Sequence, residues 1–89
     1  MNIVHLVSLE EKATGLIGMK PIPADTLFVF ANINPGQQFH SNGVLEPFEI
    51  YFMDARGRKL SGKILVPPHD VATAPAGTNH VIEKKLDFQ

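Results

Sequence analysis

The stretch FHSNGVLEPFEIYFMD, Phe39 to Asp54, carries the strongest pattern in this chain of 89 residues. A polar tetrad, His40 to Gly43, runs into the apolar segment Glu49 to Asp54, with Pro47 between them. An apolar segment of this length bounded by turn residues is typical of a strand. The tetrad is therefore either a turn or a site that the strand carries.

Other apolar runs also have the length of strands, and glycine or proline turns separate them. The run Thr26 to Ala31 has no polar alternation, so we expect it to be covered on both faces. The turn DARGRK leads from Glu49–Asp54 back into a second strand, as in a hairpin. The remaining expected elements are strands at Asn2–Val7, Lys59–Val66 and His80–Leu86, and a loop over residues 69–79.

One short helix is expected near the N-terminus. The sequence Ser8-Leu9-Glu10-Glu11 has the form of a capping box, and Gly15 or Gly18 would end the helix after about Thr14. The apolar stripe of this helix would consist of Leu9, Ala13, Leu16 and Ile17. The chain is thus predicted to be one α+β, β-rich domain over residues 1–89, a small and mostly antiparallel barrel or curled sheet with one short helix.

Composition and charge weigh against several classes of function. Eight basic and nine acidic residues give a net charge of −1, whereas nucleic-acid binders normally carry a basic excess. The absence of cysteine excludes disulfides and thiolate chemistry. No run approaches the length of a membrane span, and the N-terminus lacks the features of a signal peptide. We expect a cytoplasmic protein, or a virion protein if a phage encodes it, that is not secreted and binds neither nucleic acid nor membrane.

No arrangement of residues predicts catalysis. Adjacent His40 and Ser41 would point to opposite faces of an extended chain, so they form a poor nucleophile–base pair. Glu49 and Asp54 lie five residues apart on one strand and face opposite sides. The four histidines lack metal-ligand spacing, although a site built across strands from two of them with Asp70 or Glu49 stays open. We therefore predict no catalytic residue, no cofactor and no metal.

The segments ATGLIGMKPIPADTLFVF and FHSNGVLEPFEIYFMDARGRKL together resemble the bacterial and archaeal domain-of-unknown-function family 192. The matching positions are Gly15, Leu16, Leu27, Phe28, Phe30, Phe39, Leu45, Pro47, Ile50, Phe52 and Asp54. Where that family has Trp-Met-Lys-Asn-Thr, this chain has His40 to Val44, and the family's C-terminal extension is not seen after Lys85. The resemblance implies a retained scaffold with an altered polar site.

These observations predict a non-enzymatic, β-rich interaction or structural subunit that binds a protein partner or itself. A decoration or cement subunit of a virus particle is one form of this prediction. The alternative is a small-ligand-binding protein or enzyme that uses the His40–Val44 loop with Glu49. In either case the candidate contact or ligand residues are His40, Ser41, Asn42, Gly43, Glu49 and Tyr51.

Overall fold

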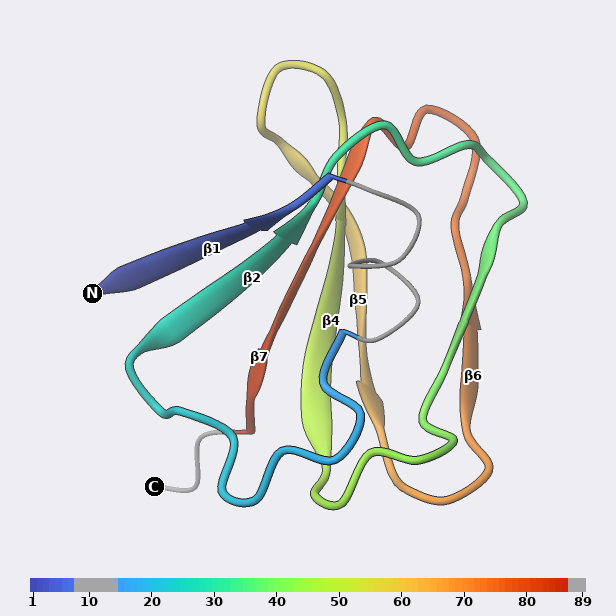
Figure 1. Cartoon of the computed structure of the whole chain (residues 1–89). Coiled ribbons are helices and arrows are strands. Elements are labelled where there is room, and N and C mark those ends of the chain that lie inside the picture. The colour runs from blue at the N-terminus through green and yellow to red at the C-terminus, as the bar shows by residue number, and fades with distance from the viewer. Residues whose placement is uncertain (8–14, 87–89) are drawn as a thin grey trace.

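The computed structural model describes residues 1–7 and 15–86, and its regular elements are all strands, arranged in two sheets (Figure 1). The larger sheet has five strands in the order β1-β2-β7-β4-β5. β1 runs parallel to β2, and the other three neighbouring pairs are antiparallel. Its strands are β1 (Asn2–Leu6), β2 (Thr26–Phe30), β4 (Phe48–Met53), β5 (Lys59–Leu65) and β7 (His80–Lys85).

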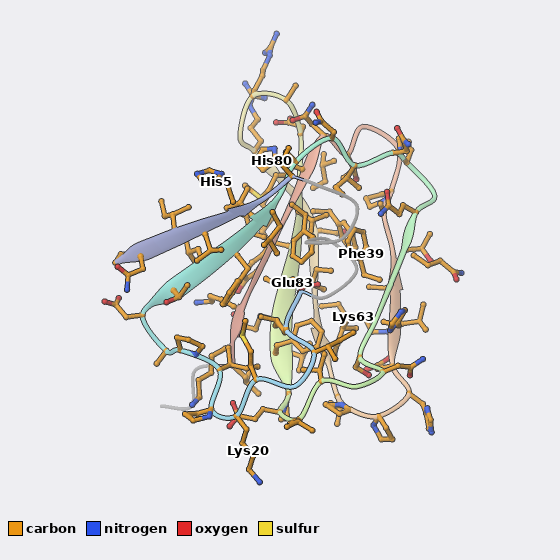
Figure 2. All side chains as sticks on the ribbon, viewed as in Figure 1. His5, Lys20, Phe39, Lys63, His80 and Glu83 are labelled. Carbon is orange, nitrogen blue, oxygen red and sulfur yellow. The ribbon has the colours of Figure 1, made fainter. Side chains whose placement is uncertain are left out.

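A second, two-stranded sheet packs on one face of the first. It consists of β3 (Gln38–His40) and β6 (Val71–Thr73), which pair antiparallel with Phe39 opposite Ala72. The Phe39 ring lies edge-on to the rings of Phe30 and Phe52, with centroid separations of 5.9 Å in both cases. Figure 2 shows Phe39 pointing into the space between the two sheets. Phe39 therefore joins the two layers.

Side chains alternate along the central strands, and one face of the large sheet supplies the core. Phe28 and Phe30 of β2, Ile50 and Phe52 of β4, and Val81 of β7 are all buried on this inner face. The connection from Gly15 to Ala24 adds Leu16 and Ile22 to the same hydrophobic cluster. The opposite face of the sheet, which we call the outer face, is directed away from β3 and β6.

The predicted α+β class was wrong. The described residues contain strands and no helix, and the sheets do not close into a barrel, because β1 and β5 remain the two edges of an open sheet. The expected helix over Ser8 to Thr14 lies outside the described residues. The residues expected to end it form a turn, in which Gly15 and Gly18 have φ values of +44° and +79°.

The expected strands are present, with bounds that differ by one residue, but the expected loop over residues 69–79 contains β6. This strand has three residues and alternates exposed, buried, exposed, so only one of its side chains, Ala72, is buried. Its stability comes from pairing with β3, which is distant in sequence, and local pattern could not indicate that pairing.

Candidate functional site

Within the tetrad, His40 ends β3, and Ser41 to Gly43 form the turn that leads from the small sheet toward β4. Ser41 is fully buried, with 0% of its surface exposed. Its hydroxyl accepts a hydrogen bond from the Asp70 N–H at 2.8 Å and donates one to the Val66 carbonyl at 3.2 Å. The Ser41 hydroxyl therefore holds the end of β3 against the segment that leads into β6, and it is not presented to solvent.

The other members of the tetrad serve the same turn. Gly43 has a φ of +81°, which favours glycine, and a Cβ at this position would lie 3.1 Å from the Ile17 side chain. His40 and Asn42 are exposed. The Ser41 hydroxyl is directed to backbone groups of Val66 and Asp70 and not to His40, so the structure does not bring a nucleophile–base pair together.

Glu49 and Tyr51 lie on the outer face, at the centre of a polar cluster. The Tyr51 hydroxyl donates to Glu49 Oε2 at 2.5 Å, and Lys84 Nζ lies 3.6 Å from the same oxygen. Lys59 Nζ sits 4.6 Å from the centroid of the Tyr51 ring, at cation–π distance. Tyr51 faces Gly62 across the β4–β5 pair. Glycine is required there, because a Cβ would lie 2.8 Å from Tyr51 Cδ1.

The six residues predicted to form one contact loop are thus divided between two places. His40 to Gly43 belong to the layer that packs on the inner face, whereas Glu49 and Tyr51 project from β4 in the opposite direction to the buried Phe48, Ile50 and Phe52. The alternative site, which combined the His40–Val44 loop with Glu49, is not assembled in the structure. Glu49 instead lines an open depression of about 300 Å³ with Tyr51, Lys59, Gly62, Lys63 and Ile64.

The outer face also carries aliphatic side chains beside this polar cluster. The pairing of β1 with β2 and of β2 with β7 places aliphatic side chains side by side across the sheet. Ile3 and Ile64, near its two edges, are 54% and 47% exposed. Figure 2 shows His5 of β1 directed away from the space between the sheets. The aliphatic side chains of the outer face are Ile3, Leu27, Val29, Ile82 and Ile64.

Among the described residues, Glu83 and Asp70 have perturbed pKa values. Burial raises the pKa of Glu83 from 4.5 to about 8, and this carboxyl projects from β7 into the core, where only 5% of the residue is exposed (Figure 2). A hydrogen bond from Lys63, followed by backbone N–H groups of Val66 and Val71, lowers the pKa of Asp70. Sequence reasoning missed Glu83. The only signal was its position two residues after Val81, on the same face of the strand.

Metal and membrane sites are not evident in the part of the chain that the structure describes. Residues 1–7 and 15–86 contain no group of three or more His, Asp or Glu side chains that could hold a metal ion. Within the same ranges, no helix has the length and apolar character needed to cross a membrane.

No family model matches the chain, and no curated protein matches it significantly. The resemblance to family 192 therefore stays a prediction. The fold is similar to that of a crystal structure from Novosphingobium aromaticivorans DSM 12444, described as a protein of unknown function, with a TM-score of 0.82 and 20% identity over 93% of this chain. It is also similar to a "putative transcription regulator" from Sinorhizobium meliloti 1021, with a TM-score of 0.81 and 14% identity over 93% of this chain.

These similarities establish the fold and carry no function to this chain. The chain spans 61% of the Novosphingobium structure and 67% of the Sinorhizobium structure. A two-sheet, all-β domain is therefore a unit that also occurs within longer proteins.

Proposed function

We propose that this chain is a non-enzymatic interaction domain that binds a protein partner through the outer face of its five-stranded sheet. The observation that carries the proposal is the row of aliphatic side chains across this face, Ile3, Leu27, Val29 and Ile82. None of the described residues forms a layer over it, since β3, β6 and the connection through Leu16 and Ile22 all pack on the inner face.

In an antiparallel sheet with one face open to solvent, the side chains on that open face are normally polar. Here β2 presents Leu27 and Val29 outward, and the neighbouring β7 presents Ile82. Contiguous exposed apolar surface on a small domain typically marks a site of interaction with another molecule. The cost of leaving these aliphatic groups in water is offset when a partner covers them.

The polar cluster supports a protein as the partner. Tyr51 combines a ring, a hydroxyl bound to Glu49 and a nearby Lys59 ammonium. Tyr51 lies opposite Ile82 on the neighbouring strand, and tyrosine is enriched at the centre of protein–protein interfaces. A nucleic acid fits less well, because Glu49 lies in the middle of the surface and the chain has a net charge of −1.

A decoration or cement subunit of a virus particle is a specific form of this proposal, in which the partner is a coat protein. The proposed absence of enzymatic activity rests on the hydrogen bonds of Ser41 and of the Glu49–Tyr51 pair, which give these polar groups structural roles.

The test is a comparison of two lysine variants on different faces. Ile82→Lys introduces a charge at the centre of the outer face, and Val71→Lys introduces the same charge on β6, where Val71 is 42% exposed. The wild-type domain would be used to capture proteins from extracts of its source, and the captured protein would be purified and its affinity measured by calorimetry. Circular dichroism would establish that both variants are folded.

We expect Ile82→Lys to weaken binding by at least about tenfold, because a buried unpaired charge costs more than 1.4 kcal/mol. Val71→Lys should leave the affinity within about twofold. If Ile82→Lys does not fold, Ile64→Lys, on the same face and already 47% exposed, replaces it. Equal affinity of the outer-face variant and wild type would contradict the proposal, as would a domain that captures no protein.

A further inference from the structure

The outer edge of β1 carries peptide groups with which no other strand of the described residues pairs. The Asn2 N–H donates to the Asp25 carbonyl at 2.8 Å, so the even-numbered residues of β1 direct their peptide groups toward β2. Because successive residues of a strand point to opposite sides, the N–H and C=O groups of Ile3 and His5 are directed away from β2. Figure 1 shows β1 as the outermost strand of the sheet, on the side opposite β6.

The side chains along this edge contain nothing that would prevent another strand from pairing with it. Natural edge strands are usually protected by lysine, proline, a bulge or a covering segment. The sequence from Asn2 to Val7 has no Lys, Arg, Asp, Glu or Pro. Two of its aliphatic side chains are open to solvent, Ile3 on the outer face and Val4 on the inner face, with exposures of 54% and 38%.

The other edge of the sheet, β5, is protected in the usual ways. Lys59 and Lys63 lie along it, and the pairing with β4 is irregular at Phe52 and Met53. Lys63 Nζ also reaches across to Asp70 Oδ1 at 3.0 Å and to the Val71 carbonyl at 2.6 Å. The domain thus protects one edge and leaves the other uncharged, which indicates that the β1 edge is paired in the working protein.

We propose that β1 pairs antiparallel with β1 of a second copy of this chain, which joins two five-stranded sheets into one. The available peptide groups select the register. A two-fold axis at Val4 places Ile3 opposite the partner copy's His5 position, so that both residues exchange N–H···O=C bonds across the interface. Four main-chain hydrogen bonds result, and the two Val4 side chains meet at the axis.

A second copy fits this edge better than an unrelated strand, because β1 is complementary to itself in that register. The pairs across the axis are Val4 with Val4, Ile3 with His5 and Asn2 with Leu6, and none of them brings two carboxylates or two ammonium groups together. The joined sheet would also make the two outer faces continuous at Ile3. The inference concerns the edge and does not depend on which protein the outer face binds.

The experiment is sedimentation velocity of the full chain over a wide range of concentrations, for wild type and three variants. Val4→Lys places two ammonium groups opposite each other at the axis. Ile3→Pro removes an N–H that is directed away from β2, so the β1–β2 ladder keeps its bonds. Val71→Lys is the matched control, since it makes the same substitution at a strand valine of similar exposure, 42% against 38%.

We expect a concentration-dependent dimer for wild type and for Val71→Lys. Ile3→Pro removes two of the four intermolecular bonds, and it should raise the dissociation constant by roughly thirtyfold. Val4→Lys should leave a folded monomer, with folding checked by circular dichroism. If Val4→Lys does not fold, the dissociation constant of Ile3→Pro alone tests the proposed dimer.

A wild-type chain that stays monomeric at all concentrations would overturn the inference, and so would an oligomer that neither β1 variant weakens. A monomer that still loses its protein partner on Ile82→Lys would overturn the dimer alone and leave the proposed function standing. A dimer that binds no protein through the outer face would overturn the proposed function and leave the dimer standing.

Discussion

Replacing Glu83 by glutamine should remove most of the pH dependence of stability between about pH 5 and pH 8. In the folded chain the Glu83 carboxyl is 5% exposed on the inner face of β7, between Phe28 of β2 and Ile50 of β4 in the register of the sheet. Burial alone raises its pKa from 4.5 to about 8, and no hydrogen bond or opposite charge offsets this effect. The folded state therefore holds this proton more tightly than the unfolded state does.

The sign and size of the effect follow from proton linkage. Below pH 4.5 the carboxyl is protonated in both states, and the stability is not reduced. Above that pH the unfolded chain releases the proton first, so the free energy of unfolding falls by up to about 1.4 kcal/mol per pH unit until the folded-state pKa is reached. The total loss between the two pKa values is roughly 5 kcal/mol, and at pH 7 it is roughly 3 kcal/mol.

The assay is urea unfolding of wild type, Glu83→Gln and Asp25→Asn at intervals across this pH range. The glutamine variant keeps the shape of the side chain without a titrating proton, so it should be more stable than wild type by several kcal/mol near pH 8 and similar to it below pH 5. Asp25→Asn makes the same chemical change at a side chain that is 78% exposed, and its stability should depend on pH in the same way as that of wild type. All histidines are present in every variant, so the difference curve isolates Glu83. A difference between wild type and Glu83→Gln that does not change with pH would refute the reasoning.

Three further substitutions test the contacts that hold the two sheets together, each by chemical denaturation. Ser41→Ala removes a fully buried hydroxyl that binds Asp70 and Val66, and it should cost about 1–3 kcal/mol, whereas His40→Ala at the exposed neighbour should change stability by less than about 0.5 kcal/mol. Equal effects of these two variants would contradict the structural role of Ser41. Phe39→Ala removes both edge-on ring contacts between the layers and should cost about 3–5 kcal/mol, and a much smaller loss would show that the β3–β6 sheet contributes little to the core. Gly62→Ala places a Cβ 2.8 Å from the Tyr51 ring and should cost about 1–3 kcal/mol, a penalty that Tyr51→Ala should relieve if the clash is its cause.

The central strands could be predicted from the sequence because their signals are local. Thr26–Phe30 and Phe48–Met53 are apolar runs of strand length between turn residues, and the hairpin from β4 to β5 follows from the turn around Gly57. These elements define the buried sheet. The run Thr26–Phe30 was expected to be covered on both faces, but it is buried on the inner face only, because Leu27 and Val29 are half-buried on the outer face.

The parts that could not be predicted depend on contacts between distant segments. The pairing of β6 with β3 joins residues more than thirty positions apart and gives each three-residue strand its stability. The parallel position of β1 at the edge of the sheet follows from tertiary packing, since alternation in Asn2–Leu6 does not specify a partner strand. The helix prediction relied on a capping box and on Leu16 and Ile17 sharing a face, but Leu16 is buried and Ile17 is 42% exposed in a glycine-bounded turn.

The candidate site was likewise predictable only where its signal is local in sequence. Glu49 and Tyr51 were identified among the contact residues, and the structure places them on one surface. The tetrad was predicted to be an exposed turn; the turn lies at Asn42 and Gly43, whereas His40 belongs to β3 and Ser41 is buried and therefore unavailable for contact. The outer face itself could not be identified, because an apolar residue in a strand does not reveal which face of a sheet another layer will cover.

The most direct measurement of the central claim is hydroxyl-radical footprinting of the domain with and without its captured protein partner. Tyr51 and Met53 project from β4 on the outer face and react readily with hydroxyl radicals, whereas Met19 packs against the core and serves as the internal reference. If the outer face is the binding surface, the partner will lower the modification of Tyr51 and Met53 severalfold and leave that of Met19 unchanged. Unchanged modification of both Tyr51 and Met53 in the complex would contradict the account.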